Sequence, residues 1–325
     1  MIDNFLIVAQ QVAVLFVLMG FGAAMRKAGF FKENAIDGIV NVLILVVTPC
    51  IIVDVFQRPF DPSMLKGLGL AFLIAVLAHV VLILLANAVV HHRDEGVRRP
   101  LCLAAVFSNA GFMGIPLEQA VLGDVGVFYG IVYVVVFNLF MWSWGHHLMI
   151  SEEHKVKSKA RAGRKVLHFS LFTHHSVLNP GTVGLVLGAP LFFLSVKLPT
   201  VVGLPIHHMA NLNTPLAMIV IGYALAGAEF GKVVRTGAVY VATLLRLVVC
   251  PLLVICALYP FRHALDRNMM LAVTIAASAP VAAMVSMFAS KFHRDVDVSV
   301  AVVSGTTLLS ILTMPVVIAL AMAVL

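Results

Sequence analysis

Apolar residues run along this chain in long stretches that short polar segments separate. Ten of these stretches have about the length of a helix that crosses a bilayer, which needs roughly 20 residues. In chain order, which gives us the names span one to span ten, they lie at about 5–25, 37–57, 64–90, 99–120, 125–150, 179–196, 207–228, 236–260, 268–290 and 298–325. The pattern predicts an all-α polytopic membrane protein with ten transmembrane helices.

One sizeable polar segment divides the ten spans into two blocks of five. It runs from about His146 to His175 and carries many charged residues. We therefore expect 1–150 to form a first five-helix block, 151–177 a cytoplasmic linker, and 178–325 a second block. Because five is odd, a second block with the same internal structure enters the membrane from the opposite face. The sequence thus predicts an inverted repeat.

Helix-breaking residues interrupt spans four and nine, which occupy corresponding places in the two blocks. Glycine lowers the cost of leaving helical geometry, and proline removes a backbone donor. Matching interruptions in the two halves of a repeat indicate the binding site of a transporter. The alternative is a pair of proline kinks used for packing. The interrupting residues are Ser108, Gly111 and Pro116 in span four and Ala279 and Pro280 in span nine.

The two interruptions also predict the kind of ligand. The second half of a broken helix begins with unpaired amide groups and the positive end of a dipole, and such an end attracts anions. Spans four and nine enter from opposite faces, so their second halves would begin near each other in mid-membrane. We expect the side chains of Asn109 and Ser278 at this crossing.

Two Thr-Pro pairs support the repeat. Thr48-Pro49 lies in span two and Thr214-Pro215 in span seven, 166 positions later. The same offset carries Asn109 to position 275, a few residues before Pro280. The two blocks therefore keep an approximate common register.

Composition and charge agree with a membrane location. Hydrophobic residues make up 61% of the chain and charged residues 11%, whereas soluble domains have about 45–50% and 25%. The net charge of +7 does not indicate nucleic acid, because the basic residues lie in short loops. Sixteen Lys and Arg residues fall in loops on one predicted side and five on the other. The positive-inside bias places the first side in the cytoplasm and both termini outside, in the cell (inner) membrane.

Acidic residues are absent from the expected middle of every span. Asp54 falls in the outer third of span two, and Glu118 and Asp124 flank the outer end of span four. Proton and sodium carriers usually keep a carboxylate within the membrane. Its absence favours an anionic substrate without obligatory cation coupling, and Asp54 is the one candidate proton carrier.

One basic residue, Arg246, lies about ten residues into span eight. A charge at the centre of a span costs about 2.5–3.5 kcal/mol on insertion scales, so a partner must satisfy it. A substrate counter-charge is one candidate. Pairing with backbone carbonyls freed by a nearby break, or snorkelling toward the cytoplasm, is the simpler interpretation.

Metal and enzyme chemistry find no support in the sequence. Thirteen histidines are present, but no Cys or carboxylate stands beside the His-His pairs at ligand spacing. No His-Glu-x-x-His helix, Gly-x-Ser-x-Gly elbow or paired acidic cluster occurs. We expect no metal, no cofactor and no catalytic residue.

Several motifs together resemble one known family. The most specific is the run from Asn109 to Pro116, of the form Asn-x-x-x-Met-Gly-Ile-Pro. Supporting motifs, in this order, are Val136-Phe137-Asn138-Leu139, Trp144-Gly145, Asn179-Pro180, Thr214-Pro215 with Gly222, and Ala279-Pro280 followed by Ser310 to Pro315. The chain resembles the auxin efflux carrier family in its bacterial short-loop form, within the bile acid/sodium symporter-like superfamily.

The resemblance implies a fold and a transport mechanism. It implies two inverted five-helix repeats with broken crossover helices 4 and 9, a scaffold from helices 1, 2, 6 and 7, and a transport domain from helices 3–5 and 8–10 that moves like an elevator. Family members carry organic anions: auxin in plants, and malonate or malate in bacteria. A second copy of the chain, the lipid bilayer and a small organic anion are the expected partners, without nucleic acid.

Departures from the plant pattern bear on the substrate. Plant members have proline where this chain has Ser108 and glutamine where it has Val281, and 63–78 lacks their carboxylate. These departures argue against auxin as the substrate. The resemblance to bacterial family members implies a small dicarboxylate, with an auxin-like aromatic carboxylate, or a channel or sensor on the same fold, as alternatives. The expected binding residues are Asn109, Ala110, Gly111, Gly114, Ser278, Pro280, Val281, Thr48, Pro49, Thr214, Pro215 and Asn138, with Arg246 as the candidate counter-charge.

Overall fold

A computed structural model describes residues 2–30, 33–150, 180–227 and 236–325. Within these ranges the chain is all-helical, with one isolated antiparallel bridge and no strand. Seven of the described helices are long and apolar enough to cross a membrane. The prediction of an all-α polytopic membrane protein is confirmed at this level. The predicted linker, 151–177, lies outside the described residues.

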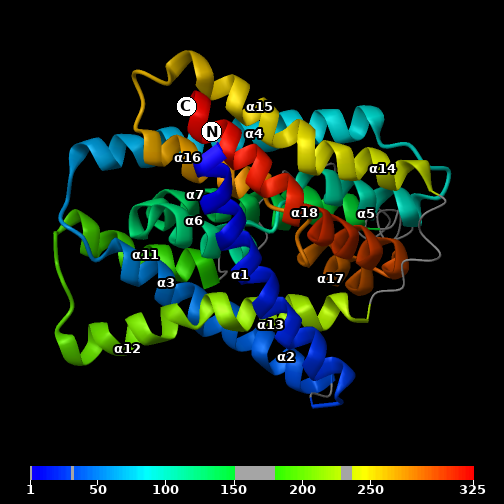
Figure 1. Cartoon of the computed structure of the whole chain (residues 1–325), viewed down its shortest axis with the longest axis horizontal. Coiled ribbons are helices and arrows are strands. Elements are labelled where there is room, and N and C mark those ends of the chain that lie inside the picture. The colour runs from blue at the N-terminus through cyan, green and yellow to red at the C-terminus, as the bar shows by residue number, and fades with distance from the viewer. Residues whose placement is uncertain (1, 31–32, 151–179, 228–235) are drawn as a thin grey trace, which may run out of the picture.

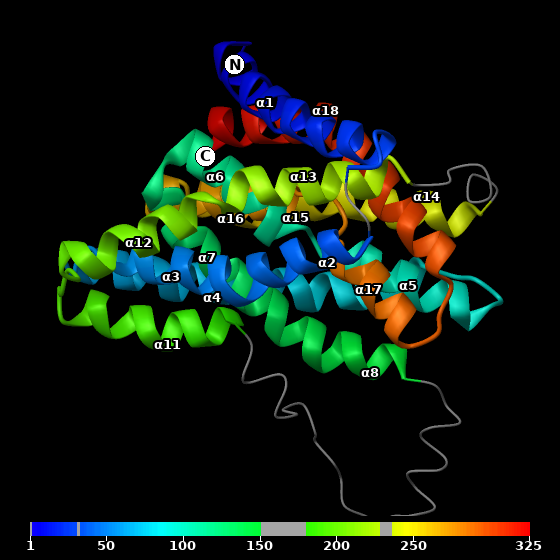
Figure 2. The same cartoon turned by 90° about the horizontal axis from the view of Figure 1, so that it is seen from below.

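The helices run in both directions along the long axis of the molecule, and the two ends of the chain lie near one another (Figures 1 and 2). The first half consists of α1 (Ile2–Lys27), α2 (Glu33–Val42), η1 (Leu43–Val47), α3 (Thr48–Phe56), α4 (Pro62–Val89), α5 (Glu95–Val106), η2 (Ala110–Gly114), α6 (Ile115–Leu122), α7 (Asp124–Phe140), η3 (Met141–Gly145) and α8 (His146–Met149). The second half consists of α11 (Pro180–Phe193), α12 (Thr200–Asn211), α13 (Asn213–Leu225), α14 (Gly237–Leu244), η4 (Leu245–Val249), α15 (Cys250–Leu258), η5 (Tyr259–Phe261), α16 (Arg267–Ser278), α17 (Met284–Lys291) and α18 (Val296–Val324).

The membrane-length helices coincide with seven of the ten predicted spans. They are Phe5–Lys27, Ala35–Phe56, Pro62–Val89, Asp124–Met149, Thr200–Ala226, Gly237–Phe261 and Val296–Val324. A shorter apolar helix, α11, falls on predicted span six. Spans four and nine each fall on two shorter helices, α5 with α6 and α16 with α17. The arrangement as ten spans in two inverted repeats stays a prediction.

Prolines follow three of the four π-helical segments in the described part of the chain. The π-helical segments η1, η2 and η4 each end two residues before a proline: Pro49, Pro116 and Pro251. A proline has no N–H, and its ring crowds the carbonyl four residues earlier, so a wider turn relieves the clash. In the first case the Thr48 hydroxyl donates to the Leu43 carbonyl at 2.9 Å. Two of these wide turns border the cavity described below.

Glycines bring α1 and α13 into close contact. A Cβ atom on Gly22 would overlap the carbonyl group of Ile219, and one on Gly222 would overlap that of Met19. Lipid offers no hydrophobic driving force between helices, so close packing through small residues is a main source of their association. α1 also packs on α18, which connects the first span to the last.

Hydrogen bonds gather the short loops into two groups. In one group Arg99 and Arg294 both donate to the last carbonyls of the span-five helix, at residues 148–150. In the other group the N–H of Phe60 donates to the Ser195 hydroxyl at 2.8 Å. The loops of the first group belong to the predicted side with sixteen Lys and Arg residues, and those of the second group to the side with five. Which group faces the cytoplasm stays a prediction.

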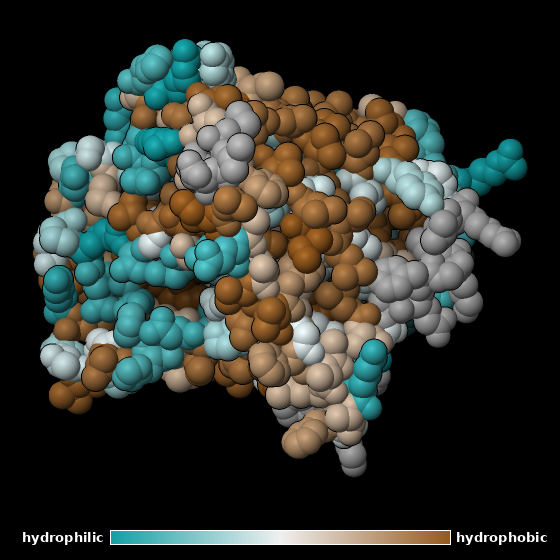
Figure 3. All heavy atoms as spheres, in the orientation of Figure 1, coloured by the Kyte–Doolittle hydropathy of each residue, from teal (hydrophilic) through white to brown (hydrophobic). Residues whose placement is uncertain are grey.

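Apolar side chains cover much of the outer surface. Hydrophobic residues spread over the middle of the face in Figure 3, whereas polar residues gather toward its left edge. Large exposed side chains on α4 include Leu73, Leu77 and Leu84. Soluble proteins rarely expose contiguous apolar patches of more than a few hundred Å², so this surface suits contact with lipid.

Candidate functional site

Both predicted interruptions are present in the described helices. α5 ends at Val106, and helical structure resumes at Ala110 as η2, which leads into α6. α16 ends at Ser278, and α17 begins at Met284. The segments between them, 107–109 and 279–283, contain the only residues of either span that leave the helix in the described ranges.

The two non-helical segments are hydrogen-bonded to each other. The N–H of Asn109 donates to the Pro280 carbonyl at 2.7 Å, and the N–H of Ala282 donates to the Phe107 carbonyl at 3.0 Å. They form the isolated antiparallel bridge between Ser108 and Val281. Non-helical backbone at membrane depth is tolerated only inside protein or beside a wet cavity. Here each segment supplies the partners that the other lost when its helix stopped.

Thr306 of α18 fixes the bridge from a third direction. Its hydroxyl oxygen accepts from the N–H of Val281 at 3.2 Å and its hydroxyl donates to the Val302 carbonyl at 2.7 Å. Both Val281 and Thr306 are fully buried. The bridge is therefore tied to the last helix of the chain as well as to both broken spans.

Arg246 joins the C-terminal ends of α5 and α16, which are the first helices of the two broken spans. One guanidinium nitrogen donates to the Val106 carbonyl at 2.7 Å, and another donates to the Ala277 carbonyl. These carbonyls belong to the last turns of α5 and α16, where no helical N–H follows to bond them. The side chain of Arg246 is 0% exposed. Arg246 therefore pairs with backbone carbonyls that the breaks leave free. This is the simpler of the interpretations that the sequence analysis offers.

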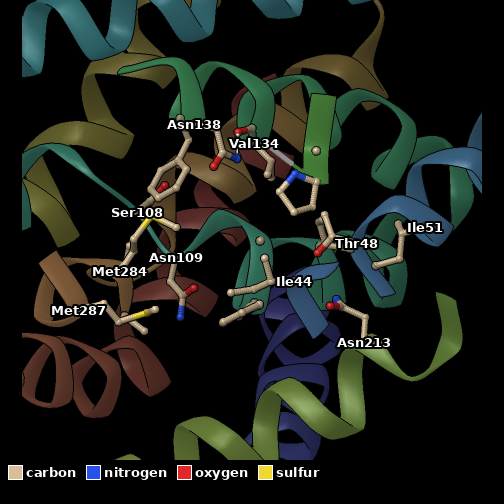
Figure 4. Close-up of a pocket in the computed structure, with 18 residues that line it drawn as sticks. Ile44, Thr48, Ile51, Ser108, Asn109, Val134, Asn138, Asn213, Met284 and Met287 are labelled. Carbon is tan, nitrogen blue, oxygen red and sulfur yellow. Dashed lines mark hydrogen bonds between the residues drawn. The ribbon is translucent and has the colours of Figure 1, made fainter. Parts of the chain in front are cut away.

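A cavity of about 110 Å³ opens beside the joined breaks (Figure 4). It is smaller than the roughly 300–1,000 Å³ pockets that hold drug-sized ligands. Both breaks, the wide turn of span two, and helices α7, α11 and α13 contribute to its walls. The lining residues are Ile44, Thr48, Ile51, Ser108, Asn109, Gly111, Phe112, Ile115, Val134, Phe137, Asn138, Pro180, Gly181, Asn213, Ala282, Ala283, Met284 and Met287.

Three neutral amides, of Asn109, Asn138 and Asn213, and the hydroxyls of Thr48 and Ser108 supply the polar side chains of this lining. Asn109 lies on one side of the cavity, and Asn213 and Thr48 lie on the other (Figure 4). Asn138 donates to the Val134 carbonyl at 2.8 Å. The buried side-chain nitrogen of Asn213 has no hydrogen-bond partner among the described residues, and leaving such a donor unmet costs about 1–3 kcal/mol. None of the lining residues is ionisable.

Residues with unbonded backbone donors also line the cavity. The N–H groups of Gly111 and Phe112 in η2 make no hydrogen bond within the described part of the chain, and neither do those of Ala283 and Met284. The first N–H groups of a helix and its dipole favour negative charge. The amides inside the bridge, by contrast, already have acceptors. The donors open to a ligand are therefore those just after each break.

The predicted binding residues divide into two sets. Asn109, Gly111, Thr48 and Asn138 line the cavity, as does Ser108 from the predicted break residues. Outside the lining lie Ala110, Gly114, Ser278, Pro280, Val281, Pro49, Thr214, Pro215, Pro116, Ala279 and Arg246.

Ser278 and Pro49 show why the second set stays outside the cavity. The hydroxyl of Ser278 donates to the Ile275 carbonyl of its own helix at 2.8 Å, and so does not extend to the crossing. The Cα atom of Pro49 lies 2.9 Å from where a Cβ atom of Gly184 would be, so Pro49 packs on α11. Both residues shape the helices that carry the cavity.

Thirteen of the 18 lining residues were not among the predicted binding or break residues, and Asn213, Phe112, Met284 and Met287 are four of them. Asn213 had a signal, because it directly precedes the Thr214-Pro215 pair that matches Thr48-Pro49. In the structure it is this asparagine, and not Thr214, that lines the cavity together with Thr48. The two methionines follow the second break on α17 and had no signal, because apolar residues fill every span.

Glu118 is more deeply buried than the sequence indicates. The sequence places it beside the outer end of span four, but its side chain is 0% exposed. Neither carboxyl oxygen has a hydrogen-bond partner among the described residues. Asp54, the expected candidate proton carrier, instead pairs with His207, whose Nδ1 lies 2.9 Å from its carboxylate. An acidic side chain is thus buried inside the protein after all.

The comparison with known proteins identifies the family. A family model described as "Membrane transport protein" matches residues 7–318. The chain belongs to this family, the auxin efflux carrier family. It is also similar to an uncharacterised transporter of Methanothermobacter thermautotrophicus, with 25% identity over 313 residues that cover 94% of this chain and 96% of that protein. The resemblance drawn from the motifs is confirmed, and membrane transport is the family's general role.

Proposed function

We propose that this auxin efflux carrier family member is a secondary transporter of small organic carboxylate anions. The observation that carries the proposal is the cavity beside the two hydrogen-bonded breaks. It brings unbonded backbone N–H groups from both broken helices together with the side chains of Asn109 and Asn213. Such donors suit a carboxylate, because hydrogen bonds to a charged acceptor are roughly twice as strong as neutral ones.

The lining bears on the kind of carboxylate. A small dicarboxylate such as malonate or malate suits the small volume of the cavity. The resemblance to bacterial family members favours the same class of substrate. The cavity also has apolar walls, formed by Phe112, Met284 and Met287, and no cationic side chain lines it. These walls favour instead a ligand with one carboxylate on an apolar body, as in an auxin-like aromatic acid. We propose the dicarboxylate first and the aromatic carboxylate as the alternative.

The helix contacts support an elevator mechanism with two domains. In the proposed scaffold, α1 and α2 pack on α13, and α3 packs on α11 and α12. In the proposed transport domain, α7 packs on α4 and α16, and α18 packs on α5 and α16. The contact between α1 and α18 crosses this division and would change as the transport domain moves. Ten spans in two inverted repeats, with α5–α6 and α16–α17 as crossover helices, complete the proposal.

Counterflow in liposomes tests the proposed function. Purified protein would be reconstituted with unlabelled malonate, malate or indole-3-acetate inside, and radiolabelled solute of the same kind outside. A carrier gives transient accumulation of label that saturates with concentration. Flux that does not saturate, without counterflow, would indicate a channel instead. Thermal stabilisation by a carboxylate with no flux at all would indicate a sensor.

A further inference from the structure

The buried carboxyl group of Glu118 lies where the two broken spans and α7 meet. Glu118 is on α6, directly after η2. A Cβ atom on Gly130 of α7 would overlap its carboxyl group. A Cβ atom on Gly114 would lie 3.9 Å from its Oε1 atom and 3.5 Å from the Cα atom of Ala276 on α16. Gly130 thus makes the space that this carboxyl group occupies, and Gly114 lies in ordinary contact with it.

No charged group in the described part of the chain compensates Glu118. Its carboxyl oxygens make no hydrogen bond and no ion pair with any described residue. α6 packs against α7, η2, α16, α1 and α13. The titratable groups with described side chains on these elements are Asp124, Tyr129, Tyr133, Arg267, Arg26, Lys27 and Tyr223.

The two arginines among these, and Asp124, have partners elsewhere. Arg26 donates to the Tyr223 carbonyl at 3.0 Å, and Arg267 donates to the Met322 carbonyl at 2.6 Å. Asp124 accepts from the Gln119 side chain at 2.9 Å. An ionised carboxylate buried without a partner is very costly, whereas a neutral acid is much less so. The packed arrangement therefore holds Glu118 in its protonated form.

Protonation of Glu118 is coupled to the shape of the cavity. Gly111 and Ile115, on the same continuous helical segment, line the cavity, and Glu118 lies one turn further on. Because the side chain is fully buried, water reaches the carboxyl group only when α6 separates from one of the elements packed against it. That separation would also displace the cavity wall. The proton and the anion therefore favour the same packed state, and the coupling is reciprocal.

We propose that Glu118 binds a proton that is transported together with the carboxylate anion. This inference rests on the proposed function and adds its coupling ion. A proton from water on the entry side forms the O–H bond of the Glu118 carboxyl group, and the packed state carries it with the anion. After the anion leaves, the same O–H bond breaks and the proton passes to water on the other side.

Accumulation driven by a pH gradient tests the proposal. Proteoliposomes more acidic outside than inside, with the membrane potential clamped at zero by potassium and valinomycin, would be given labelled malonate. One proton per anion predicts up to about tenfold accumulation for each unit of pH difference. Protein-free vesicles control for passive entry of the acid.

The Glu118→Gln variant should lose this accumulation and keep counterflow without a gradient. Asp54→Asn is the matched control, since Asp54 is the other acidic residue of interest and pairs with His207; it should respond like the unaltered protein. Proton coupling is overturned if the unaltered protein shows counterflow but no response to the gradient. Its assignment to Glu118 is overturned if Glu118→Gln still accumulates malonate, or if Asp54→Asn loses the response instead.

Infrared spectroscopy separates this inference from the proposed function. The carbonyl stretching band of a protonated acid without a hydrogen bond should be present in the unaltered protein at neutral pH and absent from Glu118→Gln. This measurement needs no transport, so it remains decisive if no carboxylate shows counterflow. Absence of the band from the unaltered protein overturns the inference, even if the variant does not fold.

Discussion

The backbone N–H of Asn109 donates to the carbonyl oxygen of Pro280 at 2.7 Å, and so joins the two halves of the chain. The reciprocal bond from Ala282 to Phe107 makes the two helix breaks one structure. Neither break could satisfy its own backbone at membrane depth. A change in either half should therefore alter the cavity that both halves enclose.

Arg246 should hold the two breaks in register. Replacing it with lysine keeps the charge but removes the fork that reaches both the Val106 and Ala277 carbonyls. One carbonyl left without a donor costs about 1–3 kcal/mol, so Arg246→Lys should lower the melting temperature and weaken malonate counterflow. Arg262→Lys is the control, because Arg262 is half-buried and its guanidinium hydrogen-bonds only the local Tyr259 carbonyl, at 3.1 Å. Equal behaviour of the two variants would contradict this role.

Thr306 should anchor the bridge in a way that its neighbour Thr307 does not. The Thr306 hydroxyl accepts from the N–H of Val281, whereas the Thr307 hydroxyl donates only within its own helix, to the Val303 carbonyl. Thr306→Val would leave the buried N–H without an acceptor and cost about 1–3 kcal/mol. Thr307→Val should cost less. The melting temperatures of the two purified variants check this, and the reverse order would refute it.

Gly130 should be required only while Glu118 is present. A methyl group at Gly130 overlaps the Glu118 carboxyl group, and overpacking of this kind costs about 1–3 kcal/mol. Gly130→Ala should therefore destabilise the unaltered protein and be tolerated beside Glu118→Ala. A double-mutant cycle on melting temperature measures the coupling between the two positions. Additive effects would show that the two residues do not share this space.

Gly222 should set the distance between α1 and α13. A Cβ atom at Gly222 overlaps the Met19 carbonyl group, whereas one at Gly20 meets nothing within 4 Å. Gly222→Ala should lower the melting temperature through about 1–3 kcal/mol of overpacking. Gly20→Ala should be neutral or stabilising, since alanine favours the helix by about 1 kcal/mol. A larger loss from Gly20→Ala would contradict the close contact.

The sequence predicted the helical class and the positions of the breaks because both depend on local chemistry. Apolar length identifies a span, and Pro280 lies within the second break, whereas the first break at 107–109 precedes Pro116, through which helical structure continues. The sequence did not predict that N–H groups of each break would bond carbonyl groups of the other. That pairing depends on how two distant segments meet, which no local pattern records.

The cavity was only partly predictable for a related reason. Asn109 and Thr48 stood out because polar residues are rare in the spans. Ser278 stood out equally, yet its hydroxyl bonds its own helix at 2.8 Å, because a serine can satisfy itself locally. The depth of Glu118 depends on Gly130, which lies on a different helix. Such a pocket becomes visible only when the helices are packed.

The half-saturating malonate concentration for counterflow by Asn109→Ala tests the central claim most directly. Asn109 is 6% exposed, and its side chain lines the cavity at the joined breaks. A lost hydrogen bond to a charged group is worth about 1.5–3 kcal/mol, so the half-saturating concentration should rise about ten- to a hundredfold. Asn87→Ala, whose exposed amide bonds only the Ile83 carbonyl, should leave it unchanged. An Asn109→Ala protein that saturates at the same malonate concentration as the unaltered protein would contradict binding at this site.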